Sequence, residues 1–525
     1  MKVLTSGQSS LGFTMKGIPA LQRDPDTVVR LPVDDPSLSL LLASLEDFQS
    51  QAISYCYWKS SRRVQAVLAG EGDLDLLISR HDQHRAQAIL LGRGYKRFPC
   101  VPMRDHPAVE SYLGCDEPSG RLIHLHLHFR LVVGERLHKN YRIPWETAVL
   151  ARATSHPALP VRILDPASEA VLLAVRACLE LRRLDPVTLR GWRTTLTRFA
   201  LDRKQLAGML DRAQLAGRAS ELLGEEIGMM LTDAIYGGGS LEKNRRLRSA
   251  IQRHFAPYQT YNALEARLRS TARALHWAAG SLNKSFLHLP RPWNRCAPGG
   301  GSVVALIGID GSGKTSVNSS IRAWLGSEID VMPVYFGTGE GRPSLLLRPF
   351  KLLVPLVAIL LRNKPKGASH GKISKDGPGL LYSLCLMVWA ALVAREKRVK
   401  LLAARRGASR GLIVLTDRYP QNEISGFNDG PLLTRLAWAP SWLRQWETKA
   451  YLLAQRLPPD LVIKLIVPPE TIARREPDMD SKVVRDRIEA VPRLTFAGAR
   501  VVSVNAEQPL ADVIRTVKRE IWRIL

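Results

Sequence analysis

The chain has 525 residues and a formal net charge of +27, with 75 lysines and arginines against 48 aspartates and glutamates. Its length predicts two or three domains, and its 45% hydrophobic and 23% charged residues are typical of a folded globular protein rather than a disordered one. The positive charge predicts attraction to polyanions such as nucleotides, but the sequence lacks the aromatic and basic pattern of specific nucleic-acid recognition.

The cysteine pattern and the N-terminal sequence indicate the cellular compartment in which the protein is expected. The six cysteines show neither CxxC pairs nor metal-ligand spacing, which predicts reduced thiols in the cytosol. The first 25 residues are expected to form a loose tail, and they lack the apolar core and cleavage site of a signal peptide. We therefore expect a cytoplasmic protein.

The first acidic motif lies within residues 1–160, which mix strand and helix patterns. Asp73 and Asp75 open an apolar strand, so both carboxylates project from one face of it. Such a pair is suited to hold the Mg²⁺ ion that bridges the phosphates of a nucleotide. With Ser60 and Ser61 upstream and the helix pattern that follows, this stretch resembles the nucleotidyltransferases. The resemblance implies an α+β nucleotidyltransferase-like domain over residues 1–160.

Three histidines depart from the pattern of that family. The family carries a third carboxylate on a later strand, and this chain has His126 at that place. His124, His126 and His128 share one strand face, so a zinc-like site is an alternative to a magnesium site. The domain is accordingly expected to be a weakened transferase or a nucleotide-binding module without turnover.

The remainder of the chain divides at a Pro/Gly-rich stretch. Helix-period segments occupy residues 161–290, and a linker is expected at 291–301. Over residues 302–525 apolar strands alternate with helices, which predicts an α/β domain with a parallel sheet, flanking helices and a site at the carboxyl ends of the strands. We expect strands at 302–308, 412–417, 461–468 and 500–506, a helix at 314–326, and an amphipathic C-terminal helix.

A phosphate-binding loop follows the first of these strands. The sequence GIDGSGKT at 308–315 matches G-x-x-x-x-G-K-[ST] at every fixed position. Its glycines let successive backbone N–H groups turn toward the phosphates, and the next helix adds its positive N-terminus. Lys314 is expected to contact the β- and γ-phosphates, and the Thr315 hydroxyl to ligate Mg²⁺. The residues expected to bind ATP here are Gly308, Asp310, Gly311, Ser312, Gly313, Lys314, Thr315 and Ser316.

Later motifs add charged groups to this site. A strand ends at Asp417, which places a carboxylate near the metal, and Arg418 can hold an anionic group of an acceptor through two parallel hydrogen bonds. A mobile arginine segment that closes over phosphates supplies positive charge and excludes water. Four arginines after the third strand are expected to form such a segment, although a solvated helix face is the alternative: Arg474, Arg475, Arg485 and Arg487.

These motifs, in their order, resemble the thymidylate kinase family of P-loop nucleoside monophosphate kinases. The segments that carry the resemblance are GIDGSGKTS, DRY, PPDLVIKLIVPPETIARRE and VVSVNAEQPLADVI, and they span residues 302–525. The resemblance implies a five-stranded parallel sheet flanked by helices, with a lid. It also implies that Asp310 faces a sugar hydroxyl of the acceptor, Arg418 its phosphate, and Asp417 the magnesium ion.

Two further roles follow from the same resemblance. The loop at Asn505 and Ala506 is expected to lie against the adenine. Because Gly311 occupies a position where some members have arginine, the catalytic cation is expected to come from the lid, as Arg474 or Arg475.

The sequence thus predicts an ATP- and Mg²⁺-dependent phosphotransferase that acts on a nucleoside monophosphate or another small phosphorylated acceptor. The residues after the DRY motif depart from the pattern with which the family binds a thymine base, so the identity of the acceptor stays open. The chain also resembles kinase-like proteins of bacterial surface-polysaccharide biosynthesis.

Two alternatives to a kinase remain open at this point. The first is nucleotidyl transfer through Asp73 and Asp75. The second is a nucleotide-gated scaffold whose apolar and basic segment at 345–394 contacts the inner face of the membrane or a glycan-assembly complex. The apolar run at 379–394 is shorter than the roughly 20 residues of a membrane span, so a buried helix is expected there. No specific nucleic-acid partner is expected, and the oligomeric state stays open.

Overall fold

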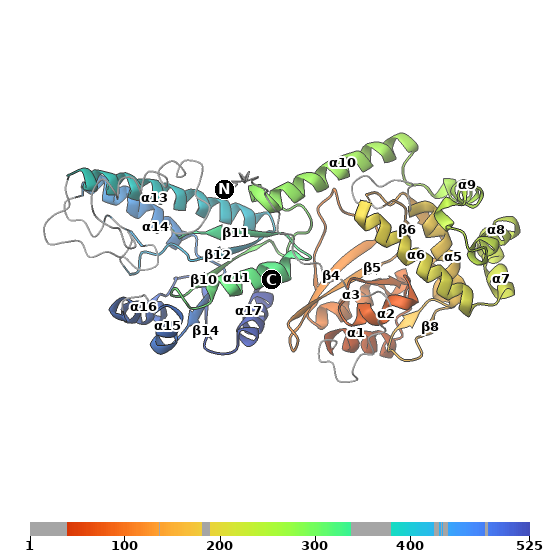
Figure 1. Cartoon of the computed structure of the whole chain (residues 1–525), viewed down its shortest axis with the longest axis horizontal. Coiled ribbons are helices and arrows are strands. Elements are labelled where there is room, and N and C mark those ends of the chain that lie inside the picture. Colours follow the sequence, from red (N-terminus) through yellow and green to blue (C-terminus); the bar gives the residue numbers. More distant parts are fainter. Residues whose placement is uncertain are drawn as a thin grey trace, which may run out of the picture. The chain divides into compact units, whose positions relative to one another are not determined.

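The described part of the chain contains a seven-stranded sheet, a run of helices, and a five-stranded sheet that carries the phosphate-binding loop (Figure 1). The structure is a computed structural model, and it describes residues 39–135, 137–180, 189–337, 380–424, 430–431, 433, 439–477 and 481–525. The expectations for the first 25 residues and for most of the segment at 345–394 fall outside these ranges.

The C-terminal sheet is parallel throughout, in the order β11-β12-β10-β13-β14. Its strands are β10 (Ser302–Ile307), β11 (Val331–Tyr335), β12 (Ile413–Asp417), β13 (Leu461–Ile466) and β14 (Arg500–Asn505). Every residue of the central strand β10 is buried, as expected of an apolar run that has a strand on each side and helices on both faces. The predicted α/β class with a five-stranded parallel sheet is confirmed.

Two pairs of helices cover this sheet. The helices of this region are α11 (Lys314–Gly326), α13 (Leu380–Ser409), α14 (Ser441–Arg456), α15 (Pro469–Arg475), α16 (Ser481–Arg493) and α17 (Leu510–Ile524). Helix α13 packs against α14 and α11 against α17, and Figure 1 shows the two pairs on opposite sides of the strands. In α17 the buried residues Val513, Val517 and Ile521 recur every fourth position, which produces the predicted amphipathic helix.

Helix α13 contains the apolar run that was predicted to form a buried helix. Ala390, Val393 and Ala394 are buried, whereas Leu384 and Val388 keep 55% and 41% of their surface exposed. The prediction is therefore confirmed as a helix, and the buried residues described in this run lie in its later part. Within the described ranges, none of the helices combines the length and the apolar character needed to cross a bilayer.

The strand β11 was missed in the sequence. It has only five residues, includes Pro333, and lies at the edge of the sheet, where it pairs with β12 alone. An edge strand tolerates proline because one side of it needs no ladder hydrogen bonds. The same proline interrupts the apolar pattern by which the other four strands were recognised.

The N-terminal sheet is mixed, in the order β3-β4-β5-β2-β1-β9-β8. Its strands are β1 (Tyr55–Tyr57), β2 (Leu74–Ile78), β3 (Lys96–Arg97), β4 (Val109–Asp116), β5 (Arg121–His128), β8 (Thr154–Ser155) and β9 (Arg162–Ile163). Strand β2 runs antiparallel to β1 and parallel to β5, which in turn is antiparallel to β4. A separate hairpin joins β6 (Leu131–Val133) to β7 (Tyr141–Ile143). The short helices here are α1 (Ser39–Ser50), α2 (Val64–Leu68), α3 (Gln83–Gly92) and α4 (Glu146–Leu150).

Among the described residues from 166 to 282, helices joined by short turns follow this sheet. They are α5 (Pro166–Glu180), α6 (Leu189–Met209), α7 (Arg212–Leu223), α8 (Glu225–Tyr236), α9 (Arg245–His254) and α10 (Ala263–Leu282). Helix α5 is buried along most of its length and forms a core with α6, α7 and α9. The predicted limits of the domains at residues 160, 290 and 302 stay predictions.

Candidate functional site

The phosphate-binding loop joins β10 to α11 at the carboxyl end of the parallel sheet. Gly311 and Gly313 adopt positive φ angles of 81° and 86°, which glycine adopts without the steric cost that a side chain imposes. Gly313 directly precedes α11, so its conformation turns the chain into the helix. The N-terminus of α11 and the loop backbone thereby face the same region, as anion binding requires.

Gly308 matters for a different reason: its backbone lies close to the Ser312 side chain later in the same loop, which leaves little room for a Cβ atom. A Cβ atom at this position would lie 2.5 Å from Ser312 Oγ and 3.2 Å from the carbonyl oxygen of Leu465 on β13. The first of these distances is far below van der Waals contact. A side chain at 308 would therefore force Ser312 Oγ to rotate away and the Leu465 carbonyl group to shift.

Lys314 lies inside the turn, with 7% of its surface exposed. Its Nζ donates a hydrogen bond of 2.7 Å to the carbonyl oxygen of Ile309 and lies 3.6 Å from Asp310 Oδ1. Burial lowers the pKa of Lys314, and Asp310 opposes this shift. The ammonium group is thus held in place by the loop itself. Thr315 and Ser316, in the first turn of α11, are exposed.

Asp310 lies between three cationic side chains. Its carboxylate accepts a hydrogen bond of 2.8 Å from Arg418 Nη2 and lies 3.4 Å from Arg487 Nη1. Burial raises the pKa of Asp310, but Arg418, Lys314 and Arg487 together outweigh burial, so its pKa lies below the ordinary value. In the described structure this carboxylate is the anion that the surrounding cations contact.

Asp417 and Arg418 end β12 directly beside the loop. Asp417 pairs in register with Leu306 on β10, one residue before that strand ends. Arg418 has a positive φ of 64°, and its backbone N–H donates to the carbonyl oxygen of Leu306 at 3.0 Å. A residue other than glycine in this conformation costs free energy, and such residues concentrate at functional sites.

The lid arginines reach the loop to different degrees. Arg475, on α15, donates a hydrogen bond of 3.1 Å to the carbonyl oxygen of Gly311. Arg487, on α16, contacts Asp310 as described above. Arg474 instead donates to Thr471 Oγ1 within its own helix, at 3.1 Å. The catalytic role predicted for Arg474 or Arg475 stays a prediction, and Arg487 joins them as a residue beside the loop.

The loop predicted to lie against adenine is at the same edge of the sheet. Asn505 ends β14, and its Oδ1 accepts a hydrogen bond of 3.0 Å from the backbone N–H of Glu507. The N–H of Ala506 donates to the carbonyl oxygen of Ile466 on β13, at 2.8 Å. Since β13 lies between β14 and β10, one strand separates this turn from the phosphate-binding loop.

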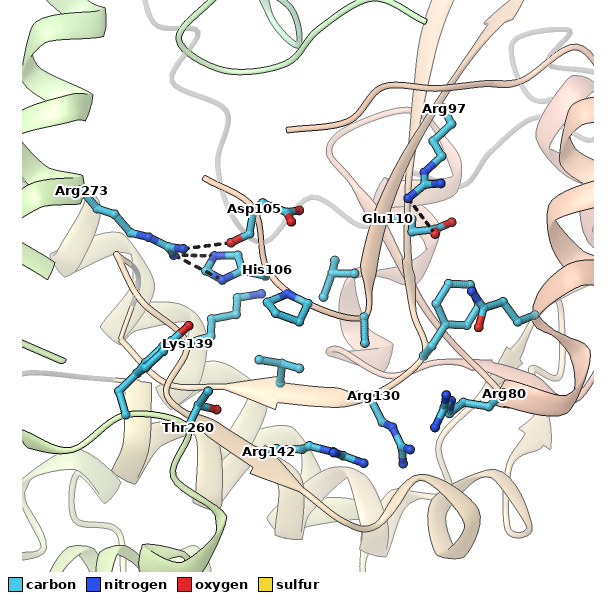
Figure 2. A pocket seen from close by; sticks show the side chains of 17 residues that line it. Arg80, Arg97, Asp105, His106, Glu110, Arg130, Lys139, Arg142, Thr260 and Arg273 are labelled. Atoms are coloured by element: carbon cyan, nitrogen blue, oxygen red, sulfur yellow. Dashed lines mark hydrogen bonds and ion pairs between the residues drawn. The ribbon is translucent and has the colours of Figure 1, made fainter. Parts of the chain in front are cut away.

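A cavity of about 550 Å³ lies in the N-terminal half of the chain (Figure 2). It opens where β2 and β5 end and β4 begins, and the β6–β7 hairpin and α10 contribute to its walls. Its described lining contains six lysine and arginine side chains against two carboxylates. The sequence did not indicate this cavity, because its cationic residues come from five separate segments.

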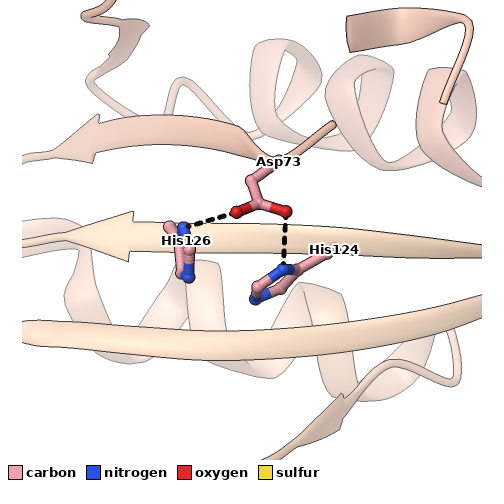
Figure 3. Close-up of side chains that lie close together, drawn as sticks. All are labelled: Asp73, His124 and His126. Atoms are coloured by element: carbon pink, nitrogen blue, oxygen red, sulfur yellow. Dashed lines mark hydrogen bonds and ion pairs between the residues drawn. The ribbon is translucent and has the colours of Figure 1, made fainter. Parts of the chain in front are cut away.

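Asp73, His124 and His126 form a cluster of potential metal ligands on the N-terminal sheet (Figure 3). One donor atom from each lies within 4.8 Å of the others. Asp73 Oδ1 is 2.8 Å from His124 Nδ1, and Asp73 Oδ2 is 3.7 Å from His126 Nδ1. The parallel register of β2 and β5 places Asp73 and Asp75 opposite the histidines on one face, as the sequence predicts.

Asp75 belongs to a more buried network beside this cluster. Its Oδ1 is 2.9 Å from His128 Nε2 and 3.5 Å from His126 Nδ1. Burial raises the pKa of Asp75, but Lys59 and the two histidines outweigh it, and the pKa lies well below the ordinary value. Burial also lowers the pKa of Lys59 to about 8. Lys59 is a charged neighbour that the sequence analysis missed.

Ser60 and Ser61 lie in the turn that leaves β1 beside this network. The Ser61 backbone N–H donates to Glu169 Oε1 at 2.9 Å, which ties the turn to α5. Burial raises the pKa of Glu169 to about 7. Ser60 Oγ is buried, and within the described part of the chain it has no hydrogen-bond partner.

Comparisons with known proteins concern less than half of the chain, and no family model matches it. The uncharacterized ATP-binding protein YghS of Escherichia coli K12 is 29% identical over 230 residues, which are 42% of this chain and 93% of that protein. The uncharacterized ATP-binding protein YghR of the same strain is 24% identical over 229 residues, or 42% of this chain and 86% of that protein.

A thymidylate kinase is also similar to this chain. The enzyme of Limosilactobacillus fermentum is 29% identical over 234 residues, which are 42% of this chain and 94% of that protein. The crystal structure of thymidylate kinase from Ehrlichia chaffeensis aligns with 43% of this chain and 99% of its own, at 14% identity and a TM-score of 0.24. The sequence similarities support a P-loop region of the kinase type over about 42% of the chain.

We expect Gly308→Ala to disrupt the phosphate-binding loop. The added Cβ would overlap Ser312 Oγ, and such overpacking costs about 1–3 kcal/mol. Urea unfolding should report this loss, and the affinity for ATP should fall with it. Gly239→Ala is the matched control, because no atom lies within 4 Å of a Cβ built there. Wild-type stability and ATP affinity in Gly308→Ala would contradict the proposed closure of the loop.

Proposed function

We propose that the chain is an ATP- and Mg²⁺-dependent phosphotransferase that acts on a nucleoside monophosphate or another small phosphorylated acceptor. The observation that carries the proposal is the set of groups beside one phosphate-binding loop: buried Lys314, the Asp417–Arg418 pair, and the lid arginines Arg475 and Arg487. Three curated relatives support it, two of them named as ATP-binding proteins and one as a thymidylate kinase.

In this proposal the loop holds the triphosphate through its backbone. The N–H groups at 308–313 and the N-terminus of α11 contact the phosphate oxygens, and Lys314 contacts the β- and γ-phosphates. The Thr315 hydroxyl and the Asp417 carboxylate suit Mg²⁺, which prefers oxygen ligands. Thr315 is exposed at the start of α11, so its hydroxyl is open to a ligand. When bound, Mg²⁺ would neutralise charge on the β- and γ-phosphates.

Arg418 and Asp310 would then arrange the acceptor. The φ of 64° and the backbone hydrogen bond to Leu306 fix the position of Arg418, and its guanidinium is suited to hold an acceptor phosphate. An arriving phosphate would compete with Asp310 for Arg418. Released from that contact, Asp310 can accept a hydrogen bond from a sugar hydroxyl. Asn505 and Ala506 would border the adenine.

The first test is the substitution Lys314→Ala. We expect phosphoryl transfer from ATP to a panel of nucleoside monophosphates to fall about a hundredfold or more, since a preorganised charged donor is lost from the transition state. The exposed Lys449 of α14 provides the matched control Lys449→Ala. Transfer by Lys314→Ala at the wild-type rate, or no magnesium-dependent binding of ATP to the wild-type chain by calorimetry, would refute the proposal.

A second test separates the lid arginines. We expect Arg475→Ala and Arg487→Ala to lower kcat by roughly 10³-fold, in the range seen for arginines that stabilise phosphoryl transfer, with ATP affinity changed much less. Arg474→Ala should have a smaller effect, because its guanidinium contacts Thr471. Arg493→Ala is the control on α16, since that side chain is 73% exposed. Equal kcat in all four variants and the wild type would exclude a catalytic lid.

A second candidate function is metal-dependent nucleotidyl transfer in the N-terminal half. The convergence of Asp73, His124 and His126 supports a metal site there, with Asp75 beside it. Imidazole nitrogen suits Zn²⁺ and Mn²⁺ better than Mg²⁺, which prefers oxygen. The structure therefore favours a transition-metal ion over magnesium at this cluster.

Metal titration of the nucleotide-free chain tests this candidate. We expect Zn²⁺ or Mn²⁺ to bind, and the double variant Asp73→Asn/His126→Ala to lose about tenfold or more in affinity. His84→Ala, at an exposed histidine of α3, is the control. Pyrophosphate release that persists in Lys314→Ala and disappears in Asp75→Asn would assign transfer to this site. Unchanged metal affinity in the double variant would remove the site from consideration.

A further inference from the structure

The cavity of the N-terminal half is walled by cationic side chains from distant segments. Arg80 lies in the turn after β2, Arg97 on β3, Arg130 after β5 and Arg142 on β7. Lys139 precedes β7, and Arg273 comes from α10. The described lining of the cavity does not include Asp73, Asp75, His124, His126 or His128, so the metal cluster does not form part of its walls.

Three of the arginines gather at one side of the cavity, with one carboxylate, that of Glu146, at the outer limit of an ion pair. Figure 2 shows Arg80, Arg130 and Arg142 extending toward a common region. The nearest carboxylate oxygen to Arg130 is that of Glu146, at 4.0 Å, and in the described part of the chain Arg80 and Arg142 have no ion pair. Burial lowers the pKa of Arg130, the charges of Arg142 and Arg80 lower it further, and the Glu146 carboxylate opposes them in part. The three guanidinium groups therefore repel one another.

Arg273 supplies a fixed positive charge at another wall. Its Nη2 donates 2.9 Å to the carbonyl oxygen of Asp105, and its Nη1 donates 3.1 Å to that of Leu137. Two carbonyl groups orient the guanidinium but do not neutralise it. His106, 3.3 Å from Arg273 Nη1, adds no negative charge, and burial with the neighbouring cations lowers the pKa of His106 to about 3.

The two lining carboxylates leave most of this charge uncompensated. Glu110 is already occupied, because Arg97 lies 3.0 Å from it and the side chains of Gln87 and Tyr112 donate to it at 2.9 Å and 3.0 Å. Asp105 contributes its backbone carbonyl to Arg273. Lys139 is half-buried and, among the described residues, has no hydrogen bond or ion pair.

An anion is the ligand that this charge distribution favours. A concave surface lined by one sign of charge concentrates the electrostatic field and attracts counter-ions. Guanidinium groups bind phosphate through two parallel hydrogen bonds, which gives both affinity and orientation. A volume of about 550 Å³ lies in the range of small-molecule sites, and Phe129 and Tyr261 add apolar surface to the walls.

We propose that this cavity binds a small phosphorylated molecule, with Arg80, Arg130 and Arg142 on the phosphate and with Lys139 and Arg273 on further anionic or polar groups of the same ligand. The site is independent of the phosphate-binding loop at 308–315. The N-terminal half would then bind its own ligand, and this proposal does not depend on the proposed kinase activity.

The test uses the full chain carrying Lys314→Ala, so that the phosphate-binding loop contributes little to binding. Calorimetric titration with pyrophosphate, glucose 1-phosphate, ADP and inorganic phosphate compares the possible sources of the phosphate group. We expect at least one of these ligands to bind, and the added substitutions Arg130→Ala/Arg142→Ala to weaken binding tenfold or more. Arg245→Ala/Arg246→Ala removes the same charge from exposed positions of α9 and should leave binding unchanged.

The single variant Arg80→Ala separates a loss of ligand binding from misfolding. This exposed side chain has no hydrogen bond or ion pair in the described structure, so its removal should leave the fold intact. We expect it to weaken binding while the thermal unfolding midpoint stays at the value of the parent. Equal affinity in the cavity variants and the parent would overturn the proposal. An equal loss in the α9 variant, or binding only to anionic vesicles or oligonucleotides, would overturn it too.

Discussion

The close approach of the phosphate-binding loop to itself is the constraint on which the C-terminal site depends. Strand β10 is buried on all sides, so its end is fixed, and the chain must reach the N-terminus of α11 within six residues. The contact of Gly308 with Ser312 and the left-handed conformations of Gly311 and Gly313 make that turn possible. The turn also encloses the Lys314 ammonium, whose hydrogen bond to Ile309 depends on the same geometry.

The other groups of the site follow from the parallel sheet. Parallel strands bring their carboxyl ends to one edge of the sheet, so Asp417 at the end of β12 and Arg418 after it lie beside the loop. The turn after β14 lies at the same edge, one strand further away, although the sequence separates these segments widely. Helices α15 and α16 then add arginines from the segment after β13. The N-terminal half uses a mixed sheet to a similar end, since its parallel pair β2 and β5 sets carboxylates against imidazoles.

Sequence patterns predicted those features that depend on local chain geometry. The loop at 308–315, the strands β10, β12, β13 and β14, the shared face of Asp73 and Asp75, and the shared face of the three histidines each follow from spacing along one segment. The aspartates and histidines meet only through the pairing of β2 with β5. Strand β11 was missed because Pro333 breaks its pattern at a sheet edge. The contact of Arg487 with Asp310, the position of Lys59 and the cationic cavity depend on packing between segments, which periodicity does not encode.

The position of Asp310 has a consequence for the site when no phosphate is bound. Its carboxylate lies among Arg418, Lys314 and Arg487, the cations that a phosphate would otherwise occupy. The loop thus carries a substitute anion in its own sequence. With no nucleotide present, this substitute balances the positive side chains, so their repulsion does not force the loop and the lid apart. In the proposed enzyme, Asp310 would take the place of the phosphate each time the ligand leaves, so the arrangement of these three cations would not depend on a bound nucleotide.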